Sequence, residues 1–163
     1  MNYKVIDNFL PKEDFNILKN EIFSDKFEWY HIEDIANKGQ KVENFFYQVH
    51  LVYKQSKPNS NYYDLFLKNI LYKMKIKSLI RIKTNLFPNQ GKFIEHPSHI
   101  DYNFEHKGAL FSLNTCDGYT KLEDGTKIDS VANRMLFFEA FKPHCSTNTL
   151  NKSRRININF NYF

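Results

Sequence analysis

The tripeptide His99-Ile100-Asp101 is the stretch around which this sequence is organised. In an extended segment, side chains two residues apart point to the same side, so this imidazole and this carboxylate can face one ion together. One further histidine from a neighbouring strand would complete a 2-His-1-carboxylate facial triad, a ligand set typical of non-haem Fe(II) sites. His144 is the candidate for that second histidine, and Arg155 downstream is a candidate anchor for a carboxylate.

A His-x-Asp triplet is a weak signal by itself, because a turn with a capping aspartate and a surface histidine gives the same letters. The order of the later segments favours the metal site. A strand-like run at Ala109–Asn114 follows Asp101, and a turn comes at Glu123-Asp124-Gly125. A further predicted strand at Met135–Ala140 then leads directly to His144.

The last predicted strand, Ile156–Phe163, has two different faces. Its apolar side chains alternate with a polar set: Arg155, Asn157, Asn159 and Asn161. We predict that the polar set faces the inside of a barrel and that the apolar set packs against helices. This register points Arg155 inward and Arg154 outward. The alternative is that Arg155 is a solvated arginine at the start of a strand.

These segments resemble the Fe(II)/2-oxoglutarate-dependent dioxygenases, in their prolyl-hydroxylase-like branch. The similarity covers Ser78–Phe163, and the chain is also similar to small oxygenases of this type found in tailed phages. The densest pieces are His99-Ile100-Asp101, Asn133–Phe138 before Pro143-His144, and Arg154–Phe160.

The resemblance implies that His99, Asp101 and His144 bind Fe(II) and that Arg155 pairs with the far carboxylate of 2-oxoglutarate. Because the arginine is doubled, Arg154 remains a rival for that role. The implied reaction consumes O2, converts 2-oxoglutarate into succinate and carbon dioxide, and hydroxylates a prime substrate.

A second inward-facing strand is predicted at Leu79–Phe87. Its residues Arg81, Lys83, Asn85 and Phe87 share one side. We predict that some of them line the cosubstrate pocket, and we assign Asn85 and Asn157 to cosubstrate binding. The alternative is a half-exposed strand with a solvated basic face.

The predicted fold is mainly β with flanking helices: a double-stranded β-helix, or cupin-like jelly roll, of short antiparallel strands. Helices predicted at Lys12–Ser24 and up to about Lys73 would pack on the outer face of one sheet. At 163 residues the chain is expected to form a single oxygenase domain. Residues 1–77 would supply helix and strand support, and residues 78–163 would form the barrel core.

Composition sets further bounds. Hydrophobic residues make up 42% and charged residues 25% of the chain, which is ordinary for a globular protein. The net charge of +5 allows a nucleic-acid partner, but no dense basic arm favours one. Two cysteines do not make a disulfide framework, and no signal peptide or membrane span is seen. We therefore expect a cytoplasmic protein without a membrane partner, in the host cytoplasm if it is phage-encoded.

Three functional classes follow. The favoured class is a hydroxylase acting on a protein side chain, such as proline, or on a small molecule, with contacts from a loop at Tyr102–Gly108. The second is a nucleic-acid-modifying oxygenase, which would need a pocket for a flipped base. The third is a non-catalytic ligand-binding barrel, against which the presence of all four key residues argues. The sequence determines neither the prime substrate nor the oligomeric state.

Overall fold

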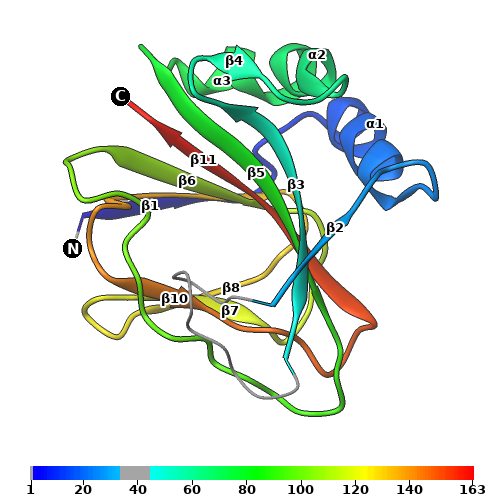
Figure 1. Ribbon diagram of the computed structural model, residues 1–163, viewed down its shortest axis with the longest axis vertical. Helices are drawn as coiled ribbons and strands as arrows, with labels where there is room; N and C mark the ends of the chain where they lie inside the picture. Colours follow the sequence, from blue (N-terminus) through cyan, green and yellow to red (C-terminus); the bar gives the residue numbers. More distant parts are fainter. Residues whose placement is uncertain (1, 34–44) are drawn as a thin grey trace.

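The structure is a computed structural model that describes residues 2–33 and 45–163. Within these residues, antiparallel strands form two sheets that face each other, and helices lie on the outer side of the larger sheet (Figure 1). The helical segments are α1 (Lys12–Phe23), α2 (Tyr63–Phe66), the π-helical turn η1 (Leu67–Leu71) and α3 (Tyr72–Met74). The strands are β1 (Tyr3–Ile6), β2 (Tyr30–Ile32), β3 (Tyr47–Lys54), β4 (Lys57–Pro58), β5 (Leu79–Pro88), β6 (Lys107–Ser112), β7 (Tyr119–Leu122), β8 (Lys127–Asp129), β9 (Arg134–Phe138), β10 (His144–Ser146) and β11 (Arg154–Tyr162).

The larger sheet has the strand order β1-β9-β6-β11-β5-β3-β2, with β4 paired to β3, and the smaller sheet has the order β10-β7-β8. This arrangement is the predicted double-stranded β-helix. The strands β1 to β4 belong to the larger sheet, so the N-terminal third of the chain extends the barrel wall. The polar stretch Asp34–Asn44, which its composition predicts to be a loop, lies outside the described residues. No helix in the described ranges has both the length and the apolar character needed to cross a membrane.

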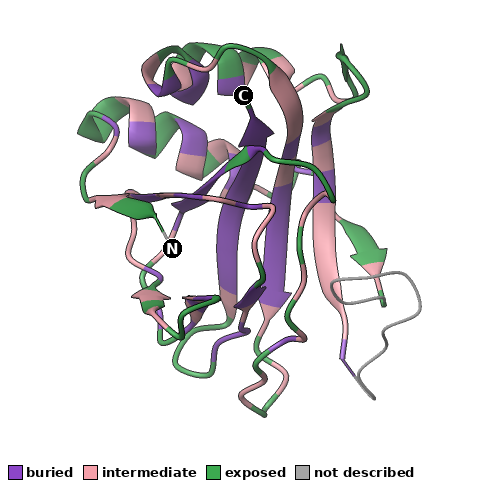
Figure 2. Ribbon diagram, turned by 90° about the vertical axis from the view of Figure 1, so that its left-hand side faces the viewer, coloured by how far each residue is buried: buried purple, intermediate pink, exposed green. Residues whose placement is uncertain are grey.

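Strand β11 lies between β5 and β6 in the larger sheet and is buried from Arg155 to Tyr162 (Figure 2). Its residues Ile156, Ile158 and Phe160 belong to the main hydrophobic core, on the side that carries the helices. The asparagines between them face the smaller sheet, because strand side chains alternate. The predicted division into an apolar outer face and a polar inner face is confirmed.

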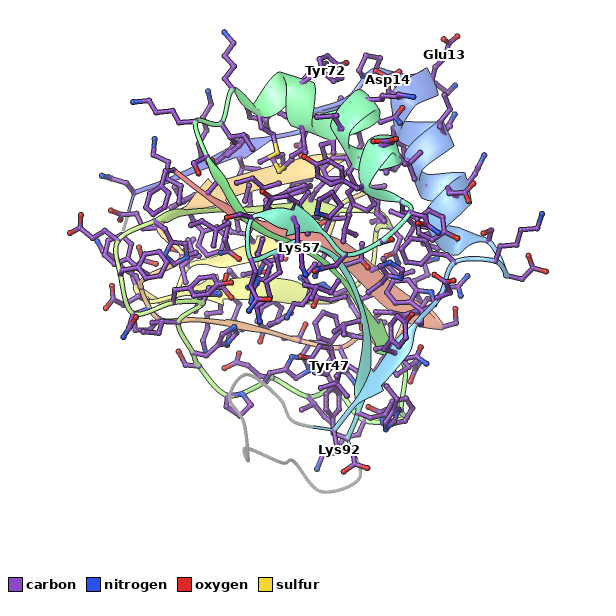
Figure 3. All side chains as sticks on the ribbon, turned by 45° about the horizontal axis from the view of Figure 1, so that its top comes forward. Glu13, Asp14, Tyr47, Lys57, Tyr72 and Lys92 are labelled. Atoms are coloured by element: carbon purple, nitrogen blue, oxygen red, sulfur yellow. The ribbon has the colours of Figure 1, made fainter. Side chains whose placement is uncertain are left out.

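The helices are amphipathic, and their apolar sides cover this outer face. Helix α1 buries Phe15, Leu18 and Ile22, which recur at helical spacing. The second segment is helical up to Met74, one residue beyond the predicted end, although its middle turn is π-helical. The hydroxyl of Tyr72 donates a hydrogen bond to Asp14 at 3.0 Å, which joins α3 to α1 (Figure 3).

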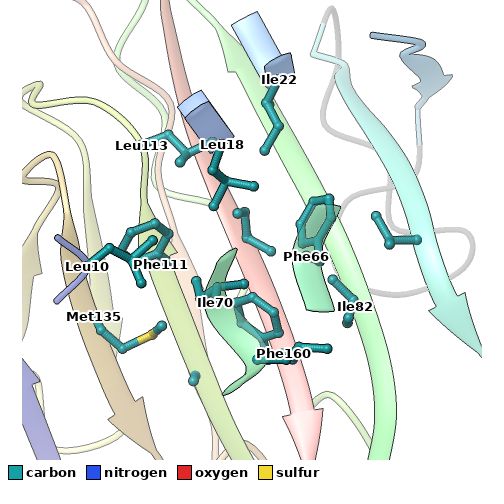
Figure 4. Close-up of a cluster of buried hydrophobic side chains, with 14 of the residues drawn as sticks. Leu10, Leu18, Ile22, Phe66, Ile70, Ile82, Phe111, Leu113, Met135 and Phe160 are labelled. Atoms are coloured by element: carbon teal, nitrogen blue, oxygen red, sulfur yellow. The ribbon is translucent and has the colours of Figure 1, made fainter. Parts of the chain in front are cut away.

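The core under the helices is continuous across the sheet. Phe66 and Ile70 from the second helical segment meet Ile82 of β5 and Phe160 of β11 in one buried cluster (Figure 4). A smaller apolar cluster bridges the two sheets. Its buried members are Leu110, Leu122, Leu136, Phe138 and Ala140. The smaller cluster therefore joins the two sheets, whereas the main cluster joins the larger sheet to the helices.

Candidate metal centre and oxoacid pocket

His99, Asp101 and His144 meet between the two sheets. His99 and His144 form an isolated antiparallel bridge in which each backbone N–H donates to the other residue's carbonyl at 2.9 Å. The backbone N–H of Asp101 donates to Ala140 at 3.0 Å. One potential ligand atom from each of the three side chains lies within 4.8 Å of the other two. The structure therefore brings together the three residues that the sequence analysis singled out.

The two imidazoles are set up to act as neutral ligands. Nδ1 of His144 lies 2.9 Å from the carbonyl oxygen of Lys142. Because a carbonyl only accepts, Nδ1 carries the proton and Nε2 keeps a free lone pair. Burial lowers the pKa of His99 to about 4, with a further contribution from His144, and burial also lowers the pKa of His144. Both rings are neutral at pH 7, the form that binds a metal.

Asp101 is held in place by three side-chain donors. Arg81 Nη2 donates to Oδ1 at 2.7 Å, and the amides of Asn161 and Asn159 donate to Oδ2 at 2.8 and 3.1 Å. Burial is the largest influence and opposes ionisation of this carboxyl. The positive charges around it, Arg81 first among them, and the hydrogen bond from Asn161 together outweigh burial and keep the pKa of Asp101 well below its usual range. Asp101 is therefore an anion with a fixed orientation.

The chemistry of this donor set fits Fe(II). Two neutral imidazoles and one carboxylate make a facial triad, which leaves coordination positions open for other ligands. Within residues 2–33 and 45–163, His99, Asp101 and His144 are the group of such side chains close enough together to hold an ion. The other nearby histidines have different surroundings. His96 packs between Phe45 and Phe87, and His106 lies 3.2 Å from the amide of Asn161.

A cavity of about 140 Å³ opens beside the triad. Asn85 and Asn157, the predicted cosubstrate residues, both line it and are opposite each other in the pairing of β5 with β11. The amide of Asn85 donates to the side-chain oxygen of Asn157 at 2.9 Å. The amide nitrogen of Asn157 is buried and has no partner among the described residues, so it is available to a bound molecule.

Arg155 lies behind the wall of this cavity and is fully buried. Its Nη1 donates to Ser146 Oγ at 2.5 Å and to the carbonyl oxygen of Thr147 at 2.9 Å, and its Nη2 donates to Thr120 Oγ1 at 3.1 Å. Ser146 and Thr120 themselves line the cavity. Burial lowers the pKa of Arg155 to about 10, so the side chain is still a cation at pH 7.

The guanidinium of Arg155 is not fully satisfied. Its Nε has no hydrogen-bond partner, and no carboxylate of the described residues forms an ion pair with it. Nε and Nη2 lie on one edge of the guanidinium, the edge that can hold a carboxylate with two parallel bonds. A buried cation without a counter-ion is costly, which argues for an anionic ligand here.

The doubled arginine is divided between the two faces of β11. The guanidinium carbon of Arg154 lies 4.8 Å from the ring centroid of Phe23 in α1, on the helical side of the sheet. Arg155 lies on the opposite side, with its guanidinium carbon 5.7 Å from the ring centroid of Phe87. The structure thus places Arg155, and not Arg154, beside the cavity.

Several contacts of this site were missed by the sequence analysis. A Cβ added at Gly118 would lie 2.5 Å from the backbone oxygen of Asn148 and 2.6 Å from Cδ of Arg155, so the glycine makes room for both the backbone and the arginine stem. Ser146 could have been found, because it follows His144 by two residues and therefore shares its strand face. The pairing of Arg81 with Asp101 had no such local signal.

Comparisons with known proteins identify the fold. Neither a protein-family model nor a curated protein sequence matches the chain significantly. A prolyl-4-hydroxylase from Pseudomonas putida superposes with a TM-score of 0.65 at 16% identity, covering 98% of this chain and 91% of that one. A Trichoplax adhaerens prolyl hydroxylase in complex with a hypoxia-inducible-factor peptide fragment gives a TM-score of 0.70 at 16% identity, over 99% and 83% of the two chains. A 2OG-Fe(II) oxygenase-family oxidoreductase from Burkholderia pseudomallei gives 0.63 at 8% identity, over 98% and 84%. At these identities the likeness establishes a shared fold.

Proposed function

We propose that this protein is an Fe(II)- and 2-oxoglutarate-dependent oxygenase that hydroxylates a protein side chain or a small molecule. His99, Asp101 and His144 would hold the metal, and Arg155 would hold the distal carboxylate of 2-oxoglutarate. The observation that carries this proposal is the fully buried Arg155, which has no acidic partner among the described residues and lies behind a cavity that the triad also lines. The whole chain would act as one domain, since β1 to β4 continue the sheet that bears the site.

When bound, Fe(II) supplies the redox chemistry that couples oxidative decarboxylation of 2-oxoglutarate to hydroxylation of a second substrate. The protein's part is to bind and orient. His144 presents Nε2, because Lys142 fixes its tautomer. Asp101 presents its carboxylate in one orientation, because Arg81 and Asn161 hold it.

The two ends of the cavity would bind the two ends of an extended dicarboxylate. At the triad end, the metal ligands face the cavity. At the other end, Ser146 and Thr120 hold the guanidinium of Arg155, whose Nε has no partner among the described residues and whose Nη2 makes one hydrogen bond. A planar bidentate contact gives both energy and direction, which fixes where the reacting end of the oxoacid lies.

The Trichoplax structure contains a peptide fragment, which favours a protein side chain as the substrate here. A small molecule remains the alternative within the same reaction class. In either case the position of the substrate's C–H group relative to the metal decides which bond reacts.

The proposal is tested by following the conversion of 13C-labelled 2-oxoglutarate into succinate by NMR, with Fe(II) and O2 and without a prime substrate. We expect slow succinate release that requires both the metal and O2. Tight binding of Mn(II) and 2-oxoglutarate without any succinate would instead indicate a non-catalytic ligand-binding barrel. Failure to bind either molecule would refute the proposed function.

A further inference from the structure

Lys83 is a second cation in the cavity that the proposed reaction does not use. It lies on the inward face of β5, two residues from Arg81, and is the cross-strand partner of Asn159. Its side chain lines the cavity, with Nζ 5.8 Å from the ring centroid of Tyr47. No carboxylate of the described residues forms an ion pair with it.

Lys83 has more positive than negative side chains around it. Burial lowers its pKa to about 8, and repulsion from Arg81 and Lys54 adds to the effect, while Asp101 acts in the other direction. At pH 7 the amine is still largely protonated. Arg81, by contrast, already has a partner in Asp101 and lies against the ring of Tyr102.

With metal and 2-oxoglutarate bound, as the proposed function requires, the site would still hold more positive than negative charge around Lys83. Arg155 would take the distal carboxylate of 2-oxoglutarate. The divalent metal would take Asp101 and the carboxylate next to the keto group. Arg81 would then share Asp101 with the metal, and Lys83 would have no ion-pair partner among the described residues. An uncompensated cation in a partly buried cavity is unfavourable.

The position of Lys83 separates it from the cosubstrate anchor. Arg155 is paired in register with Phe87, four residues further along β5 than Lys83. At a strand rise of about 3.3 Å per residue, this is a separation of roughly 13 Å along the sheet. Lys83 instead neighbours Arg81, which contacts the metal-binding carboxylate. An anion held by Lys83 would lie at the metal end of the cavity, where the prime substrate must enter.

We propose that the prime substrate carries an anionic group, a carboxylate or a phosphate, that pairs with Lys83. Lys83 is thereby a specificity-determining residue, since it selects substrates with an acidic group near the C–H bond that reacts. The charged contact also orients the substrate relative to the metal.

The test uses the full chain loaded with Mn(II) and N-oxalylglycine, an unreactive analogue of 2-oxoglutarate. Acetate and inorganic phosphate serve as probes, and each is titrated at constant ionic strength while the melting temperature is recorded. We expect a saturable rise in melting temperature with one of the two probes, and that probe identifies the acidic group as carboxylate or phosphate. Lys83→Met should weaken this binding at least tenfold, and Lys83→Arg should retain it.

Lys57→Met is the matched control, because Lys57 is exposed in the β3–β4 hairpin and lies apart from Tyr47 (Figure 3). It should leave the titration unchanged. The proposal is overturned if neither probe saturates, or if Lys83→Met binds the probe as the wild type does. It is also overturned if Lys83→Met weakens N-oxalylglycine binding, because Lys83 would then belong to the cosubstrate site.

The same experiment separates this proposal from the proposed function. If wild-type protein binds neither Mn(II) nor N-oxalylglycine, the oxygenase assignment fails. The probe titrations are then repeated on the protein alone. Binding that depends on Lys83 would still establish an anion site, and its absence would remove that site as well.

Discussion

Replacing Arg155 by methionine tests the cosubstrate pocket most directly. Methionine has a similar length and no charge, so it removes the guanidinium while filling much of its space. The ligand-free variant loses three hydrogen bonds, yet it also loses a fully buried charge that has no acidic partner among the described residues. These effects oppose each other, so we expect the variant to fold.

The size of the effect follows from the unsatisfied donors. Among the residues that the structure describes, Nε of Arg155 has no partner, and Nη2 makes one hydrogen bond although it has two hydrogens. The Nε–Nη2 edge can therefore donate two bonds to a carboxylate without breaking those to Ser146 and Thr120. A hydrogen bond to a charged group contributes about 1.5–3 kcal/mol. Two bonds at the lower end give about 3 kcal/mol, which weakens 2-oxoglutarate binding on the order of 100-fold.

The assay is isothermal titration of 2-oxoglutarate into Mn(II)-loaded protein, with the melting temperature of the ligand-free protein as a check on folding. Arg154→Met is the control, because Arg154 lies against Phe23 on the other face of β11. We expect less than a twofold change in affinity for that control. Equal losses in both variants, or a larger loss for Arg154→Met, would refute the assignment of Arg155 as the anchor.

Three further predictions address the rest of the site. His99→Ala should abolish Mn(II) binding in a calorimetric titration, and retained binding would contradict the triad. This variant is a cleaner test than Asp101→Ala, which would leave the partly buried Arg81 without its ion-pair partner. Gly118→Ala should destabilise the fold by about 1–3 kcal/mol in urea unfolding, because the new Cβ would lie 2.5 Å from the backbone oxygen of Asn148 and 2.6 Å from Cδ of Arg155. Displacement of Arg155 should also weaken 2-oxoglutarate binding, and unchanged values for both would contradict this crowding. Burial lowers the pKa of His96 to about 3, whereas a value of about 6.5 is expected in the unfolded chain. At a pH between these two values, unfolding takes up a proton, so the free energy of unfolding falls as the pH drops. Between pH 7 and pH 5 this residue alone should cost on the order of 2 kcal/mol, and His96→Gln should flatten the dependence by that amount; parallel curves for the two proteins would contradict this.

Much of the architecture follows from short-range patterns in the sequence. The alternation of β11 predicted which side chains face the helices and which face the cavity, and the helical spacing of Phe15, Leu18 and Ile22 predicted the packing side of α1. The π-helical turn at Leu67–Leu71 was not predicted, because one extra residue in a turn changes the periodicity only locally.

The metal triad and the pair Asn85 and Asn157 show what local sequence patterns predict and what the strand pairing adds. The i, i+2 spacing placed His99 and Asp101 on one side of an extended segment, and the structure adds His144 across a backbone bridge. The register of β11 against β5 then places Asn157 beside Asn85.

The sequence by itself determined the faces of the strands, the apolar sides of the helices and the local pairing of an imidazole with a carboxylate. Only the tertiary structure decided that Arg81 and Asn161 hold Asp101, that Gly118 makes room for Arg155, and that Lys83 has no acidic partner among the described residues. The physical reason is range. Side-chain alternation and helical periodicity arise from the backbone of a few neighbouring residues, whereas these contacts join segments that are distant in the sequence and meet only in the folded chain.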